Sequence, residues 1–164
     1  MRYRKVQGEC HDAQFCGEPE FAKRKKRVRG AKRKGVVYEG KVQKRFRQQF
    51  EHNYLASPWI AFVDDEGRLK YAQPDGLLIW PEHGLITIVE VKYQHSEAAW
   101  LQVHELYLPI ISRLFATEDN IWSYATLIVV KWFDSLIKWT VTPDKVKEPG
   151  RMKAGQYGVH ICPL

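Results

Sequence analysis

The sequence has few cysteines and no long apolar run. Its three cysteines, Cys10, Cys16 and Cys162, are odd in number and scattered, which argues against a disulfide framework and fits a reducing compartment. No segment approaches the roughly 20 apolar residues that span a bilayer, and the first residues lack the apolar core of a secretory signal. We therefore expect a cytoplasmic protein, in a bacterium or a phage-infected host cell, with no membrane partner.

Several well-known catalytic motifs are also missing. The chain contains no Gly-x-Ser-x-Gly, no P-loop and no glycine-rich dinucleotide fingerprint. These absences argue against an acyl hydrolase, a nucleoside triphosphatase and a Rossmann oxidoreductase. No internal repeat is visible, and 164 residues with 45% hydrophobic content suit one folded domain.

Positive charge is concentrated at the N-terminus. Residues 1–34 hold twelve Lys/Arg against four Asp/Glu, a balance of +8, whereas residues 35–164 hold fourteen against fifteen, a balance of −1. Such a basic segment repels itself and buries little, so we expect a largely flexible arm over residues 1–34 and a folded domain over 35–164. The arm is expected to attract nucleic-acid phosphates, or only to solubilise the chain. The expected nucleic-acid-binding residues are Lys23, Arg24, Lys25, Lys26, Arg27, Arg29, Lys32, Arg33, Lys34 and Lys41.

Apolar periodicity predicts a mixed α/β domain. Tyr38, Val42, Phe46 and Phe50 recur at every fourth position, which predicts an amphipathic helix from residue 36 to about 52. Strands are expected at 59–63, near 68–72, and at 77–80, 85–93, 122–133 and about 157–162, with a turn at 64–67 and a second helix over 96–115 that bends at Pro109. The order strand, helix, strand predicts that the strands at 85–93 and 122–133 are parallel.

Charged residues stand at two strand ends. Asp75 follows a hairpin strand, and fifteen residues later Glu90 and Lys92 lie two apart at the end of a strand, so they share one face. Two carboxylates and the Val91 carbonyl are hard oxygen ligands of the kind that Mg²⁺ or Mn²⁺ prefers. A neighbouring ammonium can orient the attacking water and stabilise negative charge in phosphodiester cleavage. The alternative is a solvated strand end, since an isolated Glu-x-Lys is common.

The motifs Gln73-Pro74-Asp75-Gly76 and Ile88-Val89-Glu90-Val91-Lys92 resemble the PD-(D/E)XK nuclease superfamily, over residues 36–130. The resemblance implies a restriction-endonuclease-like core, a central mixed sheet flanked by helices. It also implies a metal on Asp75, Glu90, the Val91 carbonyl and Glu39. The candidate catalytic residues are Glu39, Asp75, Glu90, Lys92 and Gln102.

The subfamily is left open by this resemblance. Phage and recombination exonucleases of the superfamily carry a Gln and a Tyr four residues apart on the helix after the motif, whereas Gln102 and Tyr107 are five apart here. The spacing of Tyr107 from Val103 and Ile111 is equally that of a core position. Junction resolvases share the helix Glu, the Asp and the Glu-x-Lys.

These patterns predict a Mg²⁺-dependent DNA nuclease that recognises DNA structure and acts in recombination, repair or phage DNA processing. Whether it cuts internally or from ends, whether it forms a homo-oligomer and whether the arm docks a protein partner are left open. The alternative function is a non-catalytic nucleic-acid-binding module. A structural zinc site across the two chain ends is a weaker alternative, because the ligand spacing is poor; its ligands would be Cys10, His11, Cys16, His160 and Cys162.

Overall fold

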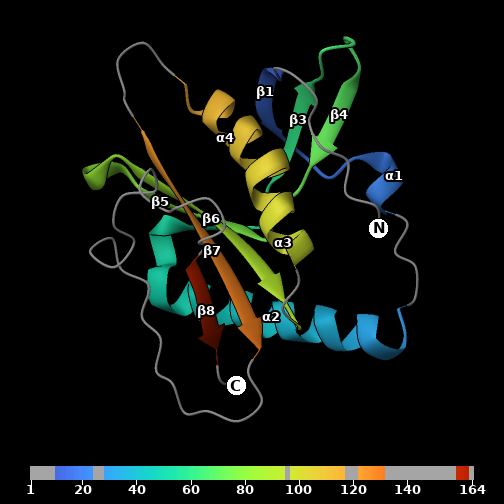
Figure 1. Cartoon of the computed structure of the whole chain (residues 1–164), viewed down its shortest axis with the longest axis vertical. Coiled ribbons are helices and arrows are strands. Elements are labelled where there is room, and N and C mark those ends of the chain that lie inside the picture. Colours follow the sequence, from blue (N-terminus) through green and yellow to red (C-terminus); the bar gives the residue numbers. More distant parts are fainter. Residues whose placement is uncertain (1–9, 24–27, 95–96, 117–121, 132–157, 163–164) are drawn as a thin grey trace.

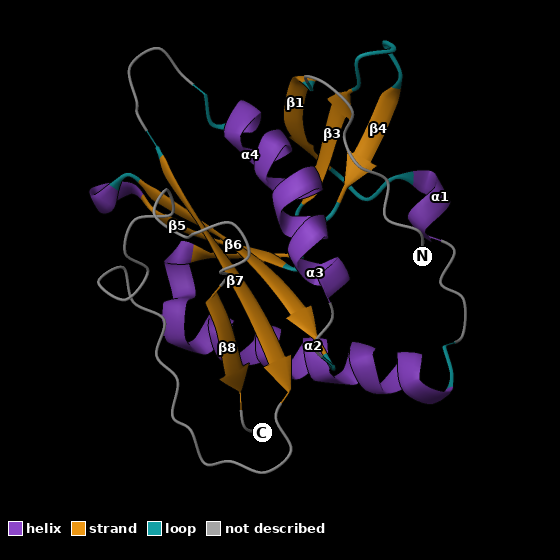
Figure 2. Ribbon diagram, in the orientation of Figure 1, coloured by secondary structure: helices purple, strands orange, loops and turns teal. Residues whose placement is uncertain are grey.

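The computed structural model describes residues 10–23, 28–94, 97–116, 122–131 and 158–162. It is an α/β structure in which helices flank mixed β-sheet (Figures 1 and 2). The strands are β1 (His11–Cys16), β2 (Tyr54–Ala56), β3 (Trp59–Val63), β4 (Leu69–Ala72), β5 (Gly76–Trp80), β6 (Leu85–Lys92), β7 (Ser123–Lys131) and β8 (Gly158–Cys162). The helices are α1 (Glu20–Lys23), α2 (Gly30–Phe50), α3 (Glu97–Gln102) and α4 (Leu108–Leu114), with short turns η1 (Glu51–Asn53), η2 (Pro81–His83) and η3 (Val103–Tyr107).

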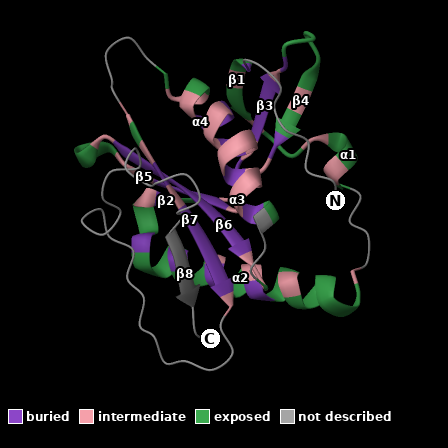
Figure 3. Cartoon of the chain, viewed as in Figure 1, coloured by how far each residue is buried: buried purple, intermediate pink, exposed green. Residues whose placement is uncertain are grey.

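The larger sheet has five strands in the order β2-β5-β6-β7-β8. Strands β2, β5 and β6 pair antiparallel, and β6, β7 and β8 pair parallel, so the predicted parallel pair of β6 and β7 is confirmed. Strand β6 is buried at every residue except Lys92, as its run of β-branched residues predicted. Figure 3 shows this burial along β6 and β7. The site-bearing strand is thus held from both sides.

Two apolar clusters fill the two faces of this sheet. On one face α2 buries Tyr38, Val42, Phe46 and Phe50 against Val89, Val91, Leu127 and Val129, which confirms the predicted helical face. On the other face α3, η3 and α4 pack Ala99, Val103, Ile110 and Ile111 against Ile86, Ile88 and Ile128. Each fully buried aliphatic side chain contributes about 1.5–3 kcal/mol to folding. This packing fixes where β6 ends relative to both helical layers.

A smaller sheet, β1-β3-β4, carries the predicted hairpin of β3 and β4. Asp64 closes its turn by accepting hydrogen bonds from the Glu66 and Arg68 amides at 3.1 and 2.9 Å. Lys70 and Arg68 also pair with this carboxylate and hold the pKa of Asp64 well below its usual range. The hairpin strand that leads toward Asp75 therefore begins from a well-braced turn.

The expected flexible arm needs correction. Residues 11–16 form β1, which pairs antiparallel with β3, and α2 begins at Gly30, so the basic residues 32–34 lie in a helix. Charge counting missed β1 because its pairing depends on backbone hydrogen bonds and on Cys10 and Ala13 packing in the core beside α4. Helix α2 extends early because Lys and Arg are good helix formers. The predicted binding residues 24–27 lie outside the described residues.

Strand β2 was also missed, because three residues carry too little periodicity to predict a strand. None of the helices in the described ranges is long and apolar enough to cross a membrane.

Candidate functional site

Asp75 and Glu90 meet where β5 and β6 stop pairing. The last paired residues at this end are Gly76 and Val89, so the next residues outward, Asp75 and Glu90, leave the ladder side by side. Asp75 Oδ2 accepts a hydrogen bond of 2.6 Å from the Val91 amide. The carboxylate therefore takes the place that a partner strand's carbonyl would otherwise occupy. This contact fixes Asp75 against the Glu-x-Lys segment.

The carbonyl of Val91 is oriented by the same contact. In an extended strand the N–H and C=O of one residue point to the same edge. Because the Val91 amide faces Asp75, its carbonyl is expected on that side too. A carboxylate and a carbonyl thus lie on the same side of β6, beyond its last pair with β5, as a cation site requires.

Glu90 and Lys92 lie on one face of β6 and form an ion pair through Glu90 Oε1 and Lys92 Nζ. The side chain of Glu90 is only 2% exposed. Burial, followed by the nearby Asp75 carboxylate, raises the pKa of Glu90 to about 8 from 4.5, while Lys92 partly opposes that rise. Glu90 Oε2 is buried and accepts no hydrogen bond within the described part of the chain. A buried carboxylate oxygen in this state calls for a proton or a cation.

Glu39 reaches the same cluster from α2. Burial, and next to it the Asp75 charge, raises the pKa of Glu39 to about 7 from 4.5. Burial also raises the pKa of Asp75, against the Val91 hydrogen bond and the Lys92 charge. The three carboxylates and Lys92 are therefore close enough to perturb one another, so the structure brings together the acidic residues and the lysine expected from sequence.

The backbone at Asp75 is held by residues that sequence reasoning missed. Gln43 Nε2 donates to Ser57 Oγ at 2.6 Å and to Glu39 Oε1 at 3.1 Å. The carbonyl of Asp75 accepts from the Ser57 amide at 3.0 Å and the Tyr54 hydroxyl at 3.2 Å. Gln43 thus connects the helix carboxylate to the loop before β5. One signal was available, since Gln43 lies one helical turn after Glu39.

Ser57 is in a strained conformation beside this network. Its φ is +44°, in the left-handed region that residues other than glycine rarely adopt. Its amide, hydroxyl and carbonyl are all engaged, the carbonyl accepting from Gln73 Nε2 at 3.1 Å. Strain of this kind persists where surrounding bonds enforce it, and it clusters at functional sites.

Gln102 lies within hydrogen-bond distance of both Lys92 and Tyr107. Lys92 Nζ donates to Gln102 Oε1 at 3.4 Å, and Gln102 Nε2 donates to the Tyr107 hydroxyl at 2.5 Å. The Tyr107 hydroxyl in turn donates to the Gln73 carbonyl at 2.9 Å. Tyr107 is therefore part of the polar network as well as buried in the core, which sequence spacing alone did not decide.

A π-helical turn explains the five-residue spacing. Val103–Tyr107 form η3, which widens the helix by one residue per turn, so positions five apart share a face. The predicted bend at Pro109 is preceded by this turn. Pro109 lacks the N–H that a regular helix would supply to the carbonyl of Glu105, four residues earlier. Glu105 lies within η3, so the wider turn falls where that hydrogen bond is missing. Such π-helical turns are frequent at functional sites.

The described residues contain no group of three or more His, Cys, Asp or Glu side chains already arranged to hold a metal ion. Instead, one oxygen of Glu90 pairs with Lys92, and one oxygen of Asp75 accepts a hydrogen bond from the Val91 amide. The donor set still fits Mg²⁺ or Mn²⁺, because Glu90 Oε2 is left without a partner among these residues and all the donors are hard oxygens.

The zinc alternative is not supported by the fold. Cys10 and Cys16 lie at the smaller sheet, whereas His160 and Cys162 lie on β8, at the far edge of the larger one (Figure 1). Cys10 is buried, and its thiol donates to the Pro109 carbonyl at 3.4 Å.

The predicted nucleic-acid-binding residues divide between elements. Lys23 ends α1 and pairs with Glu20, while Arg29 directly precedes α2. Lys32, Arg33, Lys34 and Lys41 lie on the exposed side of α2.

Comparisons of the chain with protein-family models, with curated proteins and with solved structures found no match. The candidate site is therefore the group of Glu39, Asp75, Glu90 and Lys92, here called the carboxylate–lysine cluster.

Proposed function

We propose that this protein is a metal-dependent nuclease that hydrolyses phosphodiester bonds in DNA. The observation that carries the proposal is the cluster of Glu39, Asp75 and Glu90 beside Lys92, with a buried Glu90 oxygen that has no hydrogen-bond partner among the described residues. Burial, and after it the Asp75 charge, raises the pKa values of Glu39 and Glu90, so the ionised cluster is unfavourable without a cation. Perturbed carboxylates of this kind concentrate at functional sites.

The order of elements supports the same proposal. Glu39 lies on a helix, Asp75 and Glu90-Val91-Lys92 lie at two antiparallel strand ends, Gln102 lies on the next helix, and a parallel strand follows. This is the order expected of the PD-(D/E)XK superfamily, whose restriction-endonuclease-like core the sequence resembles. Polar contacts between Lys92, Gln102 and Tyr107 support a role for Gln102 beside the lysine.

Asp75, Glu90, Glu39 and the Val91 carbonyl would hold Mg²⁺ or Mn²⁺. When bound, the ion polarises the phosphate and lowers the pKa of a bound water. Lys92, which is 28% exposed at its side chain, faces the cluster and can donate to the attacking water and to a phosphate oxygen. Glu90 and Gln102 position its ammonium. In the reaction the water loses a proton as its oxygen bonds to phosphorus, the bridging P–O bond breaks, and the leaving oxygen gains a proton.

Cleavage of labelled DNA tests this proposal. Wild type, Lys92→Ala and Asp75→Ala are compared on single strands, duplexes, flaps and junctions with Mg²⁺ or Mn²⁺. We expect each variant to lose about 100-fold or more in rate. The exposed α2 residue Lys44 provides a matched control, since Lys44→Ala removes the same charge away from the cluster. Equal cleavage by all four proteins would mean that another site or a contaminant cuts the DNA.

A non-catalytic nucleic-acid-binding module is the second candidate. It is favoured by the pairing of Lys92 with Glu90 Oε1, an ion pair within the chain that needs no reaction to explain it. Binding of DNA without cleavage, together with no heat of Mg²⁺ or Mn²⁺ binding in calorimetry, would favour this module over a nuclease.

A further inference from the structure

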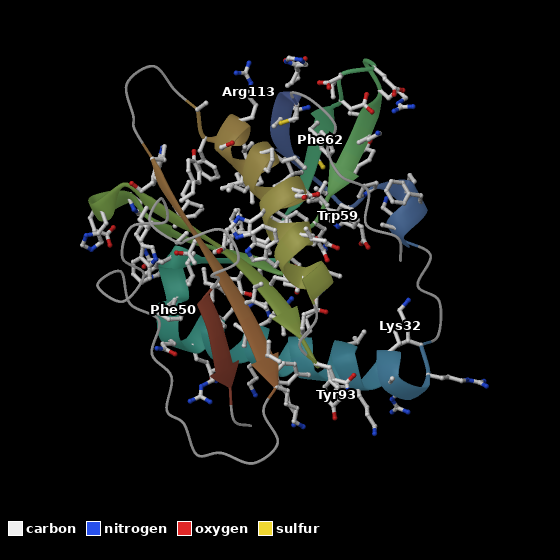
Figure 4. The ribbon with its side chains drawn as sticks, in the orientation of Figure 1. Lys32, Phe50, Trp59, Phe62, Tyr93 and Arg113 are labelled. Carbon is white, nitrogen blue, oxygen red and sulfur yellow. The ribbon has the colours of Figure 1, made fainter. Side chains whose placement is uncertain are left out.

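A basic cavity of about 360 Å³ lies between the first half of α2 and the ends of β6 and β7. Figure 4 shows Tyr93 at this place, beside α2. The cavity is lined by Gly30, Arg33, Lys34, Val37, Tyr38, Lys41, Tyr93 and Lys131. Its volume is at the lower end of the range of about 300–1,000 Å³ for small-ligand pockets, so it has room for one compact ligand.

Four of the lining residues are cations and none is an acid. They are Arg33, Lys34, Lys41 and Lys131. The first turn of α2, where the cavity begins at Gly30, also contains no acidic residue. Cations gathered around a concave surface raise the local concentration of anions, and a helix N-terminus adds to that field. The ligand that this lining fits is therefore negatively charged.

The cavity also has an aromatic side. The Tyr38 and Tyr93 rings pack edge to face, with centroids 6.1 Å apart, and Lys131 Nζ lies 5.2 Å from the centre of the Tyr93 ring. Val37 adds apolar surface and is 52% exposed. Inorganic phosphate would use only the cations. A nucleotide would use both halves, its phosphate against the cations and its sugar or base against Tyr93 and Val37.

The cavity adjoins the carboxylate–lysine cluster. Tyr38 directly precedes Glu39 on α2, and Tyr93 directly follows Lys92 after β6. Successive side chains at a strand point to opposite faces, so Tyr93 faces α2 while Lys92 faces the other side. A DNA strand whose phosphate reaches Lys92 would thus pass the C-terminal end of β6 and continue toward the cavity.

We infer that this cavity holds one nucleotide of a single-stranded segment next to the phosphate at the carboxylate–lysine cluster. The inference rests on the proposed function for what lies at that cluster, but the binding itself needs no divalent ion. It would make DNA with an unpaired segment, such as a single-stranded end or a flap, the preferred substrate class. The phosphate is held by Arg33, Lys34 and Lys41, and the apolar part by Tyr93 and Val37.

Equilibrium binding with a chelator present tests this inference. The probe is a fluorescently labelled oligothymidylate of about eight nucleotides, within the site sizes of single-strand-binding proteins. Arg33→Ala/Lys41→Ala removes two cavity charges, and Lys44→Ala/Arg47→Ala removes two charges from the same helix outside the cavity. We expect the cavity variant to bind about tenfold more weakly, with a salt dependence lower by about 0.7 in log–log slope, since the cavity holds one phosphate and each phosphate contact on a single strand contributes about 0.7. Lys44→Ala/Arg47→Ala should change the affinity and the salt-dependence slope much less.

Further arms separate the alternatives. Tyr93→Leu should weaken oligonucleotide binding severalfold, because a stacking surface is lost. It should change the salt-dependence slope by less than the slope that one phosphate contact contributes. Equal effects of the two double variants would overturn the inference. So would saturable binding of thymidine monophosphate that the cavity variant abolishes while oligonucleotide binding is unchanged, because the cavity would then serve a free nucleotide. If no DNA is cleaved yet the cavity variant binds weakly, the proposed nuclease function fails and this inference stands.

Discussion

Replacing Glu90 by glutamine should stabilise the folded protein at alkaline pH. The Glu90 side chain is 2% exposed, and burial together with Asp75 raises its pKa to about 8 from 4.5. Between these pH values the native state keeps a proton that the unfolded chain has released. The stability due to this proton is full below about pH 4.5 and is lost as the pH rises through 8. Glutamine is close in size and cannot ionise, so the variant escapes that loss.

The size of the effect follows from the pKa. A rise from 4.5 to about 8 corresponds to at most about 5 kcal/mol of lost stability above pH 8. The variant also leaves Lys92 without its ion-pair partner, which offsets part of the gain. We therefore expect Glu90→Gln to be about 2 kcal/mol more stable than wild type near pH 9 and equal to it near pH 5. Some pH dependence should remain in the variant, since the pKa of Glu39 is about 7.

Urea unfolding followed by tryptophan fluorescence and circular dichroism measures this difference. Both proteins are unfolded with a chelator near pH 5, 7 and 9, and Glu82→Gln, at an exposed position on η2, serves as the control. Added Mg²⁺ should stabilise wild type near pH 9 and have little effect on Glu90→Gln, because a cation replaces the missing proton. A wild-type stability that is flat from pH 5 to 9, or a Glu90→Gln variant no more stable than wild type near pH 9, would refute this reasoning.

Two further substitutions test the groups that position the site. A Cβ on Gly76 would lie 2.5 Å from the hydroxyl oxygen and 2.7 Å from Cζ of the buried Tyr54 ring, so Gly76→Ala should cost about 1–3 kcal/mol in urea unfolding and displace the Tyr54–Asp75 hydrogen bond. Gly40→Ala, where the added atom meets nothing within 4 Å, should be neutral or stabilising, and equal effects of the two would contradict the argument. Tyr107→Phe removes the hydroxyl that accepts from Gln102 and donates to the Gln73 carbonyl, and should lower the unfolding free energy by about 1–2 kcal/mol. It should also slow any DNA cleavage, because Gln102 would no longer be held beside Lys92. Unchanged stability and an unchanged cleavage rate would show that the hydroxyl does not position Gln102.

Much of the fold was readable from local patterns. The every-fourth apolar spacing of α2, the short apolar strand and turn residues of the β3–β4 hairpin and the β-branched run of β6 each report burial that local geometry imposes. The proximity of Asp75 to Glu90 was likewise predictable, because two strand ends separated by one tight connection return to the same edge of a sheet.

Other features depended on contacts between distant residues. Strand β1 lies within a segment whose charge predicted an arm, and only its pairing with β3 and packing beside α4 order it. The Gln43–Ser57–Asp75 network joins positions up to 32 residues apart, which no local pattern displays. Tyr107 reaches Gln102 only because η3 adds one residue to the helical turn.

The sequence by itself therefore determined which residues carry charge at the strand ends and which faces are apolar, because period-two and period-3.6 patterns are properties of local backbone geometry. Only the tertiary structure decided that Glu90 is buried with a raised pKa, that Lys92 is shared between Glu90 and Gln102, and that a basic cavity opens beside Tyr93. Burial and electrostatic coupling arise when separate elements pack together, so they depend on distances that the order of residues does not contain.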